Sequence, residues 1–305
     1  MIQVIKGTQK KIPYNDILLT IGNFDGVHRG HKKILDCMSA EKDMYRGASA
    51  VYTFDPHPRA FFKKKIEKLI TPLDEKINML EKAGVDIIVV EKFTETIANM
   101  NTQTFFKNII IEKIHPKKIF TGTHFRFGKN REGSVEDLKC LALESHIAYE
   151  RIEPLYHKDG QRVSSSLIRS FLNSGQIREA AEYLGRPYSV GGVVIKGRRT
   201  GRTIDIPTAN MDFGSFIAPK DGVYAVKIEY DCKEYNGAAN IMIRDTEPLL
   251  EVHLFDFNEI LYGKKMKVYF IERLRDEMLF KNSIELKKQI TKDILNAKKI
   301  FQINH

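Results

Sequence analysis

The stretch Gly22-Asn23-Phe24-Asp25-Gly26-Val27-His28-Arg29-Gly30-His31 decides the fold of the first half of this chain, because it sets glycines and two histidines between a strand and a helix. The apolar, β-branched run 17–21 before it is typical of a parallel strand covered on both faces. Residues 32–38 after it carry apolar side chains at helical spacing. Glycines let the backbone approach a ligand closely, and the N–H groups that open a helix attract anions. We therefore expect a phosphate-binding turn with His28 and His31 directed at one anion; a tight turn with two solvated histidines is the alternative.

The whole chain has the composition of a globular protein. Its 305 residues are enough for two domains, and 42% of them are hydrophobic. The three cysteines are far apart, which predicts neither a disulfide framework nor a zinc site and fits a reducing cytoplasm. The first residues do not resemble a leader, and no apolar run approaches the length of a membrane span. We expect a soluble, unprocessed, cytoplasmic protein that does not contact membranes.

The formal net charge of +10 raises the hypothesis of a nucleic-acid partner. The basic residues are dispersed, however, and form no stripe interleaved with aromatic side chains. A generally basic surface that attracts small polyanions explains the charge as well. We expect small-molecule partners and no nucleic acid, and a weak homo-oligomer is left open.

Short apolar segments alternate with amphipathic helices in the first half of the chain. The segments 48–54, 86–90 and 118–121 are predicted strands, and 73–83 and 102–114 are predicted helices. Such alternation favours a Rossmann-like, doubly wound α/β sheet with helices on both faces. In these sheets ligands gather at the carboxyl ends of the strands.

A change of pattern places the domain boundary. Helices predicted near 165–172 and 177–184 end at Gly185-Arg186-Pro187, where glycine and proline interrupt the chain. We therefore expect one domain over 1–185 and a second over 186–305.

The second half is predicted to be a small antiparallel β-barrel with a terminal helix. Short alternating segments recur at 191–195, 222–228, 250–254 and 265–270, with turn signals between them. A helix with one apolar face begins near Ser283.

Three further segments of the first half carry chemically distinctive side chains. Asp55-Pro56-His57-Pro58 follows a predicted strand, and its prolines fix a loop, although a rigid turn is an alternative. Residues 122–133 mix aromatics, cations and glycines, a composition that can stack on a planar ring while its cations meet phosphate. Residues 163–169 open a helix with hydroxyls and an arginine, or simply cap it.

Together these segments resemble the nucleotidyltransferase module of bacterial bifunctional riboflavin kinase/FAD synthetases, whose Gly-x-Phe-Asp-Gly-x-His-x-Gly-His loop matches here at every fixed position. Leu184-Gly185-Arg186-Pro187-Tyr188, Pro207-Thr208-Ala209-Asn210 and Glu251-Val252-His253 follow in the order of the same family. The resemblance covers essentially the whole chain.

The resemblance implies that the first domain transfers the adenylyl group of ATP to FMN, giving FAD and pyrophosphate. His28, His31 and Arg169 would supply a fixed positive field for the developing charge, with Mg²⁺ screening the phosphates. The expected phosphate contacts are Gly22, Asn23, Phe24, Gly30, Ser164 and Ser165. The expected flavin contacts are Asp55, His57, His124, Phe125 and Phe127.

The second domain resembles the riboflavin kinase barrel, in which ATP phosphorylates the ribityl 5′-hydroxyl. Glu251 stands where that family has its catalytic base. Thr208 and Asn210 would bind Mg²⁺ and the ATP phosphates through oxygen atoms, Lys196 and Gly197 would contact the phosphates, and Arg275 would contact the flavin.

Departures from the family pattern keep other functions open. His124 replaces an acidic or amide residue, and in the kinase half Asp205, Met242 and Asp245 stand where glycine, glycine and proline are usual. One alternative is an active adenylyltransferase whose impaired kinase barrel serves as a flavin-binding or regulatory module. A transferase for another phosphate ester, such as glycerol phosphate, would explain His28 and His31 but not the barrel.

Overall fold

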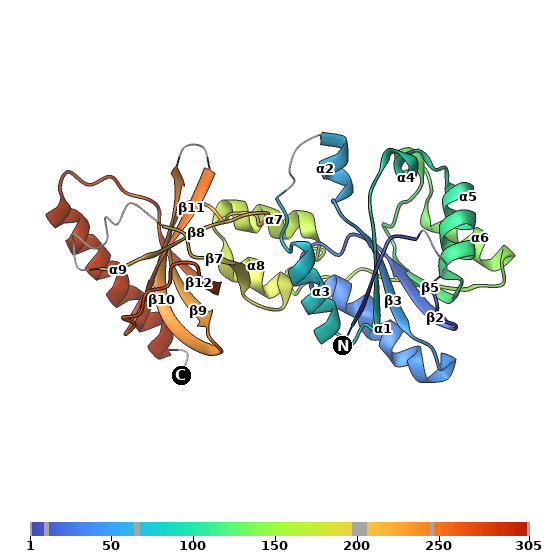
Figure 1. Cartoon of the computed structure of the whole chain (residues 1–305), viewed down its shortest axis with the longest axis horizontal. Helices are drawn as coiled ribbons and strands as arrows, with labels where there is room; N and C mark the ends of the chain where they lie inside the picture. Colours follow the sequence, from blue (N-terminus) through green and yellow to red (C-terminus); the bar gives the residue numbers. More distant parts are fainter. Residues whose placement is uncertain (1, 9–11, 64–67, 197–205, 245–246, 304–305) are drawn as a thin grey trace. The chain divides into compact units, whose positions relative to one another are not determined.

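A computed structural model gives the fold, which divides into two compact units, Met1–Ser164 and Ser165–His305. Each unit is described by itself (Figure 1). The expected domain boundary between 185 and 186 is 21 residues beyond this division and stays a prediction. The residues that the structure describes are 2–8, 12–63, 68–196, 206–244 and 247–303. Three residues singled out in the sequence, Gly197, Asp205 and Asp245, lie outside them.

The first unit contains a parallel sheet of six strands in the order β1-β4-β3-β2-β5-β6. The apolar run that opened the sequence analysis forms β2, and all five of its residues are buried. The strands are β1 (Gln3–Lys6), β2 (Ile17–Ile21), β3 (Ser49–Phe54), β4 (Ile87–Glu91), β5 (Pro116–Gly122) and β6 (Ala148–Ile152).

Helices of this unit connect successive strands. They are α1 (Arg29–Tyr45), α2 (Pro58–Lys63), α3 (Leu73–Lys82), α4 (Glu95–Asn99), α5 (Thr102–Phe105), the π-helix η1 (Phe106–Ile114), the 3-10 helix η2 (Lys129–Arg131) and α6 (Val135–Glu144). The helical span predicted over 102–114 is confirmed, but most of it is wound as a π-helix.

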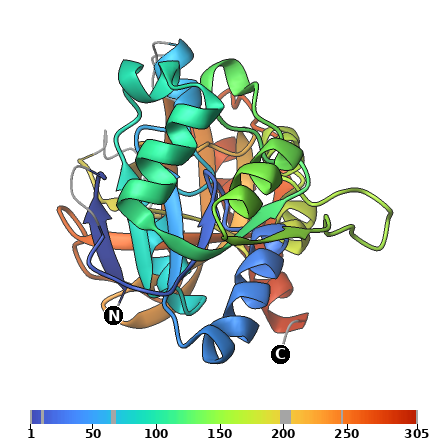
Figure 2. The same cartoon turned by 90° about the vertical axis from the view of Figure 1, so that its right-hand side faces the viewer.

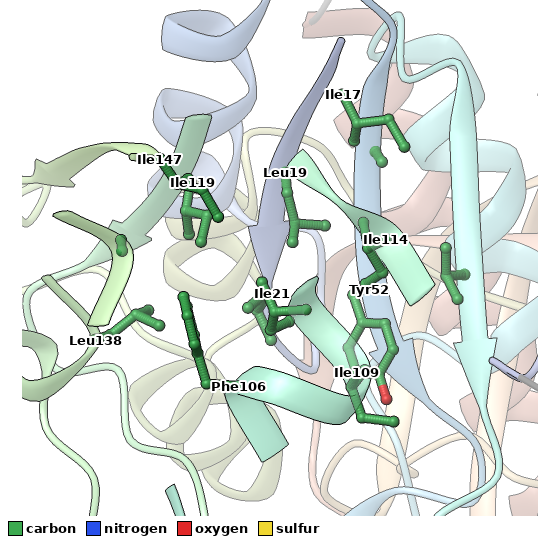
Figure 3. Close-up of a cluster of buried hydrophobic side chains, with 14 of the residues drawn as sticks. Ile17, Leu19, Ile21, Tyr52, Phe106, Ile109, Ile114, Ile119, Leu138 and Ile147 are labelled. Atoms are coloured by element: carbon green, nitrogen blue, oxygen red, sulfur yellow. The ribbon is translucent and has the colours of Figure 1, made fainter. Parts of the chain in front are cut away.

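Alternate side chains of each strand enter two different cores. In β2, Ile17, Leu19 and Ile21 pack with residues of η1 and α6, as Figure 3 shows, and with Phe105 of α5. Leu18 packs with residues of α1 and α3. Figure 2 views the unit from the side that carries α5 and η1. The sheet is therefore covered on both faces, and the doubly wound fold is confirmed.

The topology points to one edge of this sheet. Along the chain, the connections change from the face of α1 and α3 to the face of η1 and α6 after β4. As a result, α1 after β2 and α6 after β5 cover opposite faces although β2 and β5 are neighbouring strands. Ligands of open α/β sheets bind outside the carboxyl ends of the strands at such a switch point. The segments 22–31, 55–58 and 122–133 follow β2, β3 and β5, and so all three begin at this edge.

The second unit is an antiparallel sheet of six strands with helices at both ends of its sequence. The strand order is β7-β12-β9-β10-β11-β8. The elements are α7 (Ser165–Ser174), α8 (Ile177–Leu184), β7 (Tyr188–Val193), β8 (Ala209–Asp212), β9 (Gly222–Tyr230), β10 (Lys233–Arg244), β11 (Glu247–Leu254), β12 (Lys265–Arg275) and α9 (Ser283–Ile303).

The edges of this sheet approach each other, which confirms the barrel-like architecture. Ile195, just after β7, donates its backbone N–H to the carbonyl of Asn210 in β8 at 2.8 Å. The terminal helix packs Ala297 and Phe301 against the small side chains of Ala225 and Ala238. None of the helices described in either unit is long and apolar enough to cross a membrane.

Candidate active sites

The two histidines of the opening stretch cap the helix that they precede. His28 is the N-cap of α1: the backbone N–H of His31 donates to His28 Nδ1 at 3.2 Å, and the backbone N–H of His28 donates to His31 Nδ1 at 3.3 Å. The two rings stack with their centroids 3.6 Å apart. Because His28 is only 6% exposed, its ring orientation is fixed by packing as well as by the cap.

This arrangement determines the proton positions on the rings. A ring nitrogen that accepts a hydrogen bond carries no proton, so each neutral ring is protonated at Nε2. His28 and His31 therefore each present an Nε2–H donor at the N-terminus of α1, where the helix dipole is positive. Donors in this position suit a phosphate.

Gly30 leaves little space for a side chain beside the His28 ring. A Cβ on Gly30 would lie 3.2 Å from the His28 ring and 3.5 Å from the carbonyl oxygen of Val163. The short distance between Gly30 and the Val163 carbonyl also places the backbone before Ser164 next to the histidine stretch. Phe24, with φ of 50°, takes the left-handed conformation and packs its ring 4.7 Å from the His31 ring.

Two buried charged side chains, whose roles the sequence analysis missed, connect this stretch to the segment before α3 and to β3. Asp25 is 4% exposed and accepts the backbone N–H groups of Ile70 and Thr71 at 3.0 and 3.1 Å. Lys76 of α3 is equally buried and donates to Thr53 Oγ1 at 3.4 Å. A lysine within the apolar stripe of a helix, flanked by Leu73 and Leu80, was the available sequence signal.

The predicted flavin segment after β3 is an ordered turn. Asp55 is exposed, and its backbone N–H donates to the carbonyl of Glu91 at 3.0 Å. His57 Nδ1 accepts the backbone N–H of Arg59 at 3.1 Å, which supports the start of α2. The roles of Asp55 and His57 in flavin binding stay predictions.

The predicted flavin segment after β5 has a buried and an exposed part. Phe127 is 6% exposed and belongs to the core, whereas Phe125 is half-buried and stacks on it at 5.7 Å. His124 is exposed. The structure thus gives Phe127 a packing contact and leaves Phe125 and His124 nearer the surface, while all three flavin roles stay predictions.

The hydroxyl-rich segment is divided between the two units. Ser164 ends the first unit, while Ser165 begins α7 of the second, which also carries Arg169. Ser165 and Arg169 therefore belong to a different unit from the two histidines. Their action on the same phosphates stays a prediction.

In the second unit, the predicted kinase residues meet on neighbouring strands. Glu251 of β11 is paired in register with Asn210 of β8 on one side and with Asn240 of β10 on the other. Directly paired residues point to the same face of a sheet, about 5 Å apart. Asn240 was missed in the sequence, because only strand pairing brings it beside Glu251.

The two asparagines paired with Glu251 have buried side-chain oxygen atoms. The Oδ1 atoms of Asn210 and Asn240 are buried, and among the described residues neither finds a hydrogen-bond partner. A buried acceptor without a partner costs about 1–3 kcal/mol, so we expect a bound ion, a ligand or a water to satisfy these atoms. Oxygen donors are what Mg²⁺ prefers, so Asn210 fits the metal role that the sequence predicts for it. Among the described residues, no group of three or more His, Cys, Asp or Glu side chains is arranged to hold a metal by itself.

The turn before β8 is fixed by a histidine of β11. His253 Nδ1 donates to the carbonyl oxygen of Pro207 at 2.8 Å, and so holds the turn that contains the half-buried Thr208. Lys196 is exposed and directly follows Ile195, which bridges to Asn210. Thr208 therefore directly precedes β8 along the chain, Lys196 follows a residue that pairs with β8, and their phosphate contacts stay predictions.

Arg275 is engaged by a buried carboxylate. Its Nε lies 3.1 Å from both carboxylate oxygens of Asp293, and its Nη2 lies 2.7 Å from Oδ2. Asp293 is 4% exposed and also accepts from Gln289 Nε2 at 2.8 Å. This fork joins β12 to α9, and a flavin contact for Arg275 stays a prediction.

Comparisons with known proteins assign both units. A family model described as FAD synthetase matches residues 10–167, and one described as riboflavin kinase matches residues 184–301. The bifunctional riboflavin kinase/FMN adenylyltransferase of Haemophilus influenzae is 38% identical over 93% of this chain and 94% of its own. The protein of that name from Buchnera aphidicola (subsp. Acyrthosiphon pisum) is 37% identical over 99% of each chain. The chain belongs to the bifunctional riboflavin kinase/FMN adenylyltransferase family.

A solved structure extends the fold likeness over the same length. The crystal structure titled macrolide-efflux protein from Streptococcus pneumoniae has a TM-score of 0.85 and 28% sequence identity, and covers 96% of this chain and 97% of that chain. Both domains of the bifunctional riboflavin kinase/FMN adenylyltransferase family are present here, as expected from the sequence. The alternative of an impaired kinase barrel finds no support. The alternative of a transferase for another phosphate ester does not account for the riboflavin kinase match of the second domain.

Proposed function

We propose that this chain makes FMN from riboflavin in its second unit and FAD from FMN in its first, consuming ATP in both reactions. The observation that carries the proposal is the pair of family matches, FAD synthetase over 10–167 and riboflavin kinase over 184–301, on two units with separate candidate sites. The substrates are small molecules, and we infer a cytoplasmic location.

Adenylyl transfer depends on stabilising charge on phosphate. A phosphate oxygen of FMN attacks the α-phosphorus of ATP in line, the bond to the bridging oxygen breaks, and pyrophosphate leaves. Negative charge accumulates on the α-phosphate and on the leaving group. The Nε2–H groups of His28 and His31 and the N-terminus of α1 are oriented before the reaction, so they stabilise that charge without reorganisation. We infer that Ser164, Ser165 and Arg169 bind the same triphosphate.

Riboflavin phosphorylation needs a base. The ribityl 5′-hydroxyl attacks the γ-phosphorus of ATP, its proton passes to the Glu251 carboxylate, and ADP leaves. Thr208 and Asn210 would hold Mg²⁺, which screens phosphate charge when bound. His253 keeps the Pro207 turn, and with it Thr208, in place beside β11.

The test follows both products in one reaction. Purified chain is incubated with riboflavin, ATP and Mg²⁺, and FMN and FAD are resolved by chromatography over time. FMN is expected first and FAD second, and FAD alone is expected to grow when FMN is supplied in place of riboflavin. A chain that forms FMN but never FAD, or that requires a flavin other than these, contradicts the proposal.

A further inference from the structure

A lysine without an assigned role is buried beside the adenylyl-transfer site. Lys76 is 4% exposed, and burial lowers the pKa of its ammonium because desolvation disfavours the charged form. The carboxylates of Asp25 and Asp55 act in the opposite sense and favour the charge. A buried charge is costly, and these two carboxylates offset part of that cost for the Lys76 ammonium.

Two hydrogen bonds lead from this lysine to the histidine stretch. Lys76 Nζ donates to Thr53 Oγ1 at 3.4 Å, and Thr53 Oγ1 donates to the carbonyl oxygen of Asn23 at 3.3 Å. Thr53 is fully buried at the carboxyl end of β3, two residues before Asp55. The relay therefore connects α3, the end of β3 and the turn after β2.

Asp25 fastens the same stretch to the start of α3. Its Oδ1 accepts from the backbone of Ile70 and Thr71, which precede that helix. Lys76 is thus attracted electrostatically by one carboxylate of the histidine stretch and by one of the 55–58 segment. These are the segments to which ATP and FMN, respectively, are assigned.

We propose that Lys76 is a positioning residue that sets the ATP-binding and FMN-binding segments of the first unit in one mutual arrangement. The proposal rests on the proposed function of that unit. Lys76 acts through Asp25, Thr53 and Asp55 and does not touch either substrate. A substrate that orders one segment thereby favours the arrangement that binds the other, so ATP and FMN promote each other's binding through this lysine.

The test separates coupling from stability. Initial rates of FAD formation over a grid of FMN and ATP concentrations give the factor by which saturating ATP lowers the KM for FMN. Lys76→Met keeps an unbranched side chain at this buried position and removes the charge. Lys82→Met makes the same change at an exposed position of the same helix and serves as the matched control. Riboflavin phosphorylation in each preparation reports the amount of active chain.

The parent and Lys82→Met are expected to show a coupling factor of at least about fivefold, the lower end of typical coupling between sites. In Lys76→Met the factor is expected to fall close to one, and kcat/KM for FAD formation to fall at least about tenfold, with riboflavin phosphorylation unchanged. Thr53→Val removes the relay hydroxyl, is expected to lower the factor less, and adds little to Lys76→Met because both changes break one connection.

A parental coupling factor in Lys76→Met overturns the role of Lys76, as does a lowered thermal midpoint without any change in that factor. If Lys76→Met fails to fold, a parental factor in Thr53→Val overturns it. A parent chain that forms no FAD at all overturns the function proposed for the first unit, and this result is distinguishable because it requires no variant.

Discussion

At the scale of single residues, the stacked histidines make a prediction that separates catalysis from capping. His28→Ala removes both the N-cap acceptor and the Nε2–H donor, whereas His28→Asn keeps an acceptor suited to the cap. Loss of one oriented donor to a developing oxyanion costs about 2.7–4 kcal/mol. We expect FAD formation to fall about a hundredfold or more in both variants and in His31→Ala, and riboflavin phosphorylation to persist.

The measurement is the rate of each reaction in the same preparation, together with the thermal midpoint. His28→Asn is expected to keep the parental midpoint more closely than His28→Ala. Equal loss of both activities in a folded variant would contradict the assignment of separate sites to the two units.

Glu251 is predicted to show the opposite selectivity. Glu251→Gln preserves the size of the side chain and removes the base, and a general base contributes about 10²–10⁴-fold to a rate. FMN formation should therefore fall by that factor, while FAD formation from supplied FMN continues. Rates with riboflavin and with FMN as the starting flavin give the comparison. Parental phosphorylation by this variant would rule Glu251 out as the base.

At the scale of elements, the end of β12 carries an acid-sensitive cluster. Lys220 Nζ and Arg273 Nη2 each lie 2.8 Å from Asp276 Oδ1, and these partners lower the pKa of Asp276 to about 2. A carboxyl whose pKa is depressed in the folded state stabilises the fold at pH values above its unfolded-state pKa, which is near 4. This contribution is lost as the pH falls toward the folded-state pKa of about 2.

We therefore expect the thermal midpoint of Asp276→Asn to decline less than that of the parent between pH 4.5 and pH 2. The effect is small because the carboxyl is exposed. Glu277→Gln, a neighbouring exposed carboxyl, is the control and should decline as the parent does. Parallel curves for Asp276→Asn and the parent would show that the cluster contributes nothing to folding.

At the scale of the whole molecule, α7 and α8 belong with the barrel by their contacts. The backbone N–H of Lys220 donates to the carbonyl of Leu172 at 2.9 Å, and Arg178 forms an ion pair with Glu272 of β12. In α8 the side chains of Tyr183 and Leu184 are almost fully buried. The barrel should therefore be more stable with these helices than without them.

We predict that fragments 165–305 and 186–305 both fold and bind riboflavin. The shorter fragment is expected to unfold at least about 5 °C lower, since each kcal/mol shifts the midpoint of a domain of this size by about 4 °C. Calorimetry with and without riboflavin tests this. A shorter fragment without a cooperative transition would mean that the barrel depends on the helices to fold, and equal midpoints would mean that the helices contribute nothing.

Much of this architecture was readable from local patterns. The strand at 17–21, the helix at 177–184 and the start of the last helix at Ser283 lie where periodicity placed them. The edge strand β1 and the polar strand β6 were missed, because neither has a continuous apolar run. The π-helical winding of 106–114 was also missed, since π- and α-helices share nearly the same apolar spacing.

The sequence by itself determined the doubly wound class of the first unit, the turn between β2 and α1, the barrel and the family resemblance. These depend on residues close together along the chain, where spacing and backbone propensity act. Only the tertiary structure decided that Lys76 is buried beside Thr53, that Asn240 lies beside Glu251, and that His253 holds the turn at Pro207. The physical reason is that burial and strand register depend on contacts between residues far apart in the sequence, which the spacing of nearby residues does not reveal.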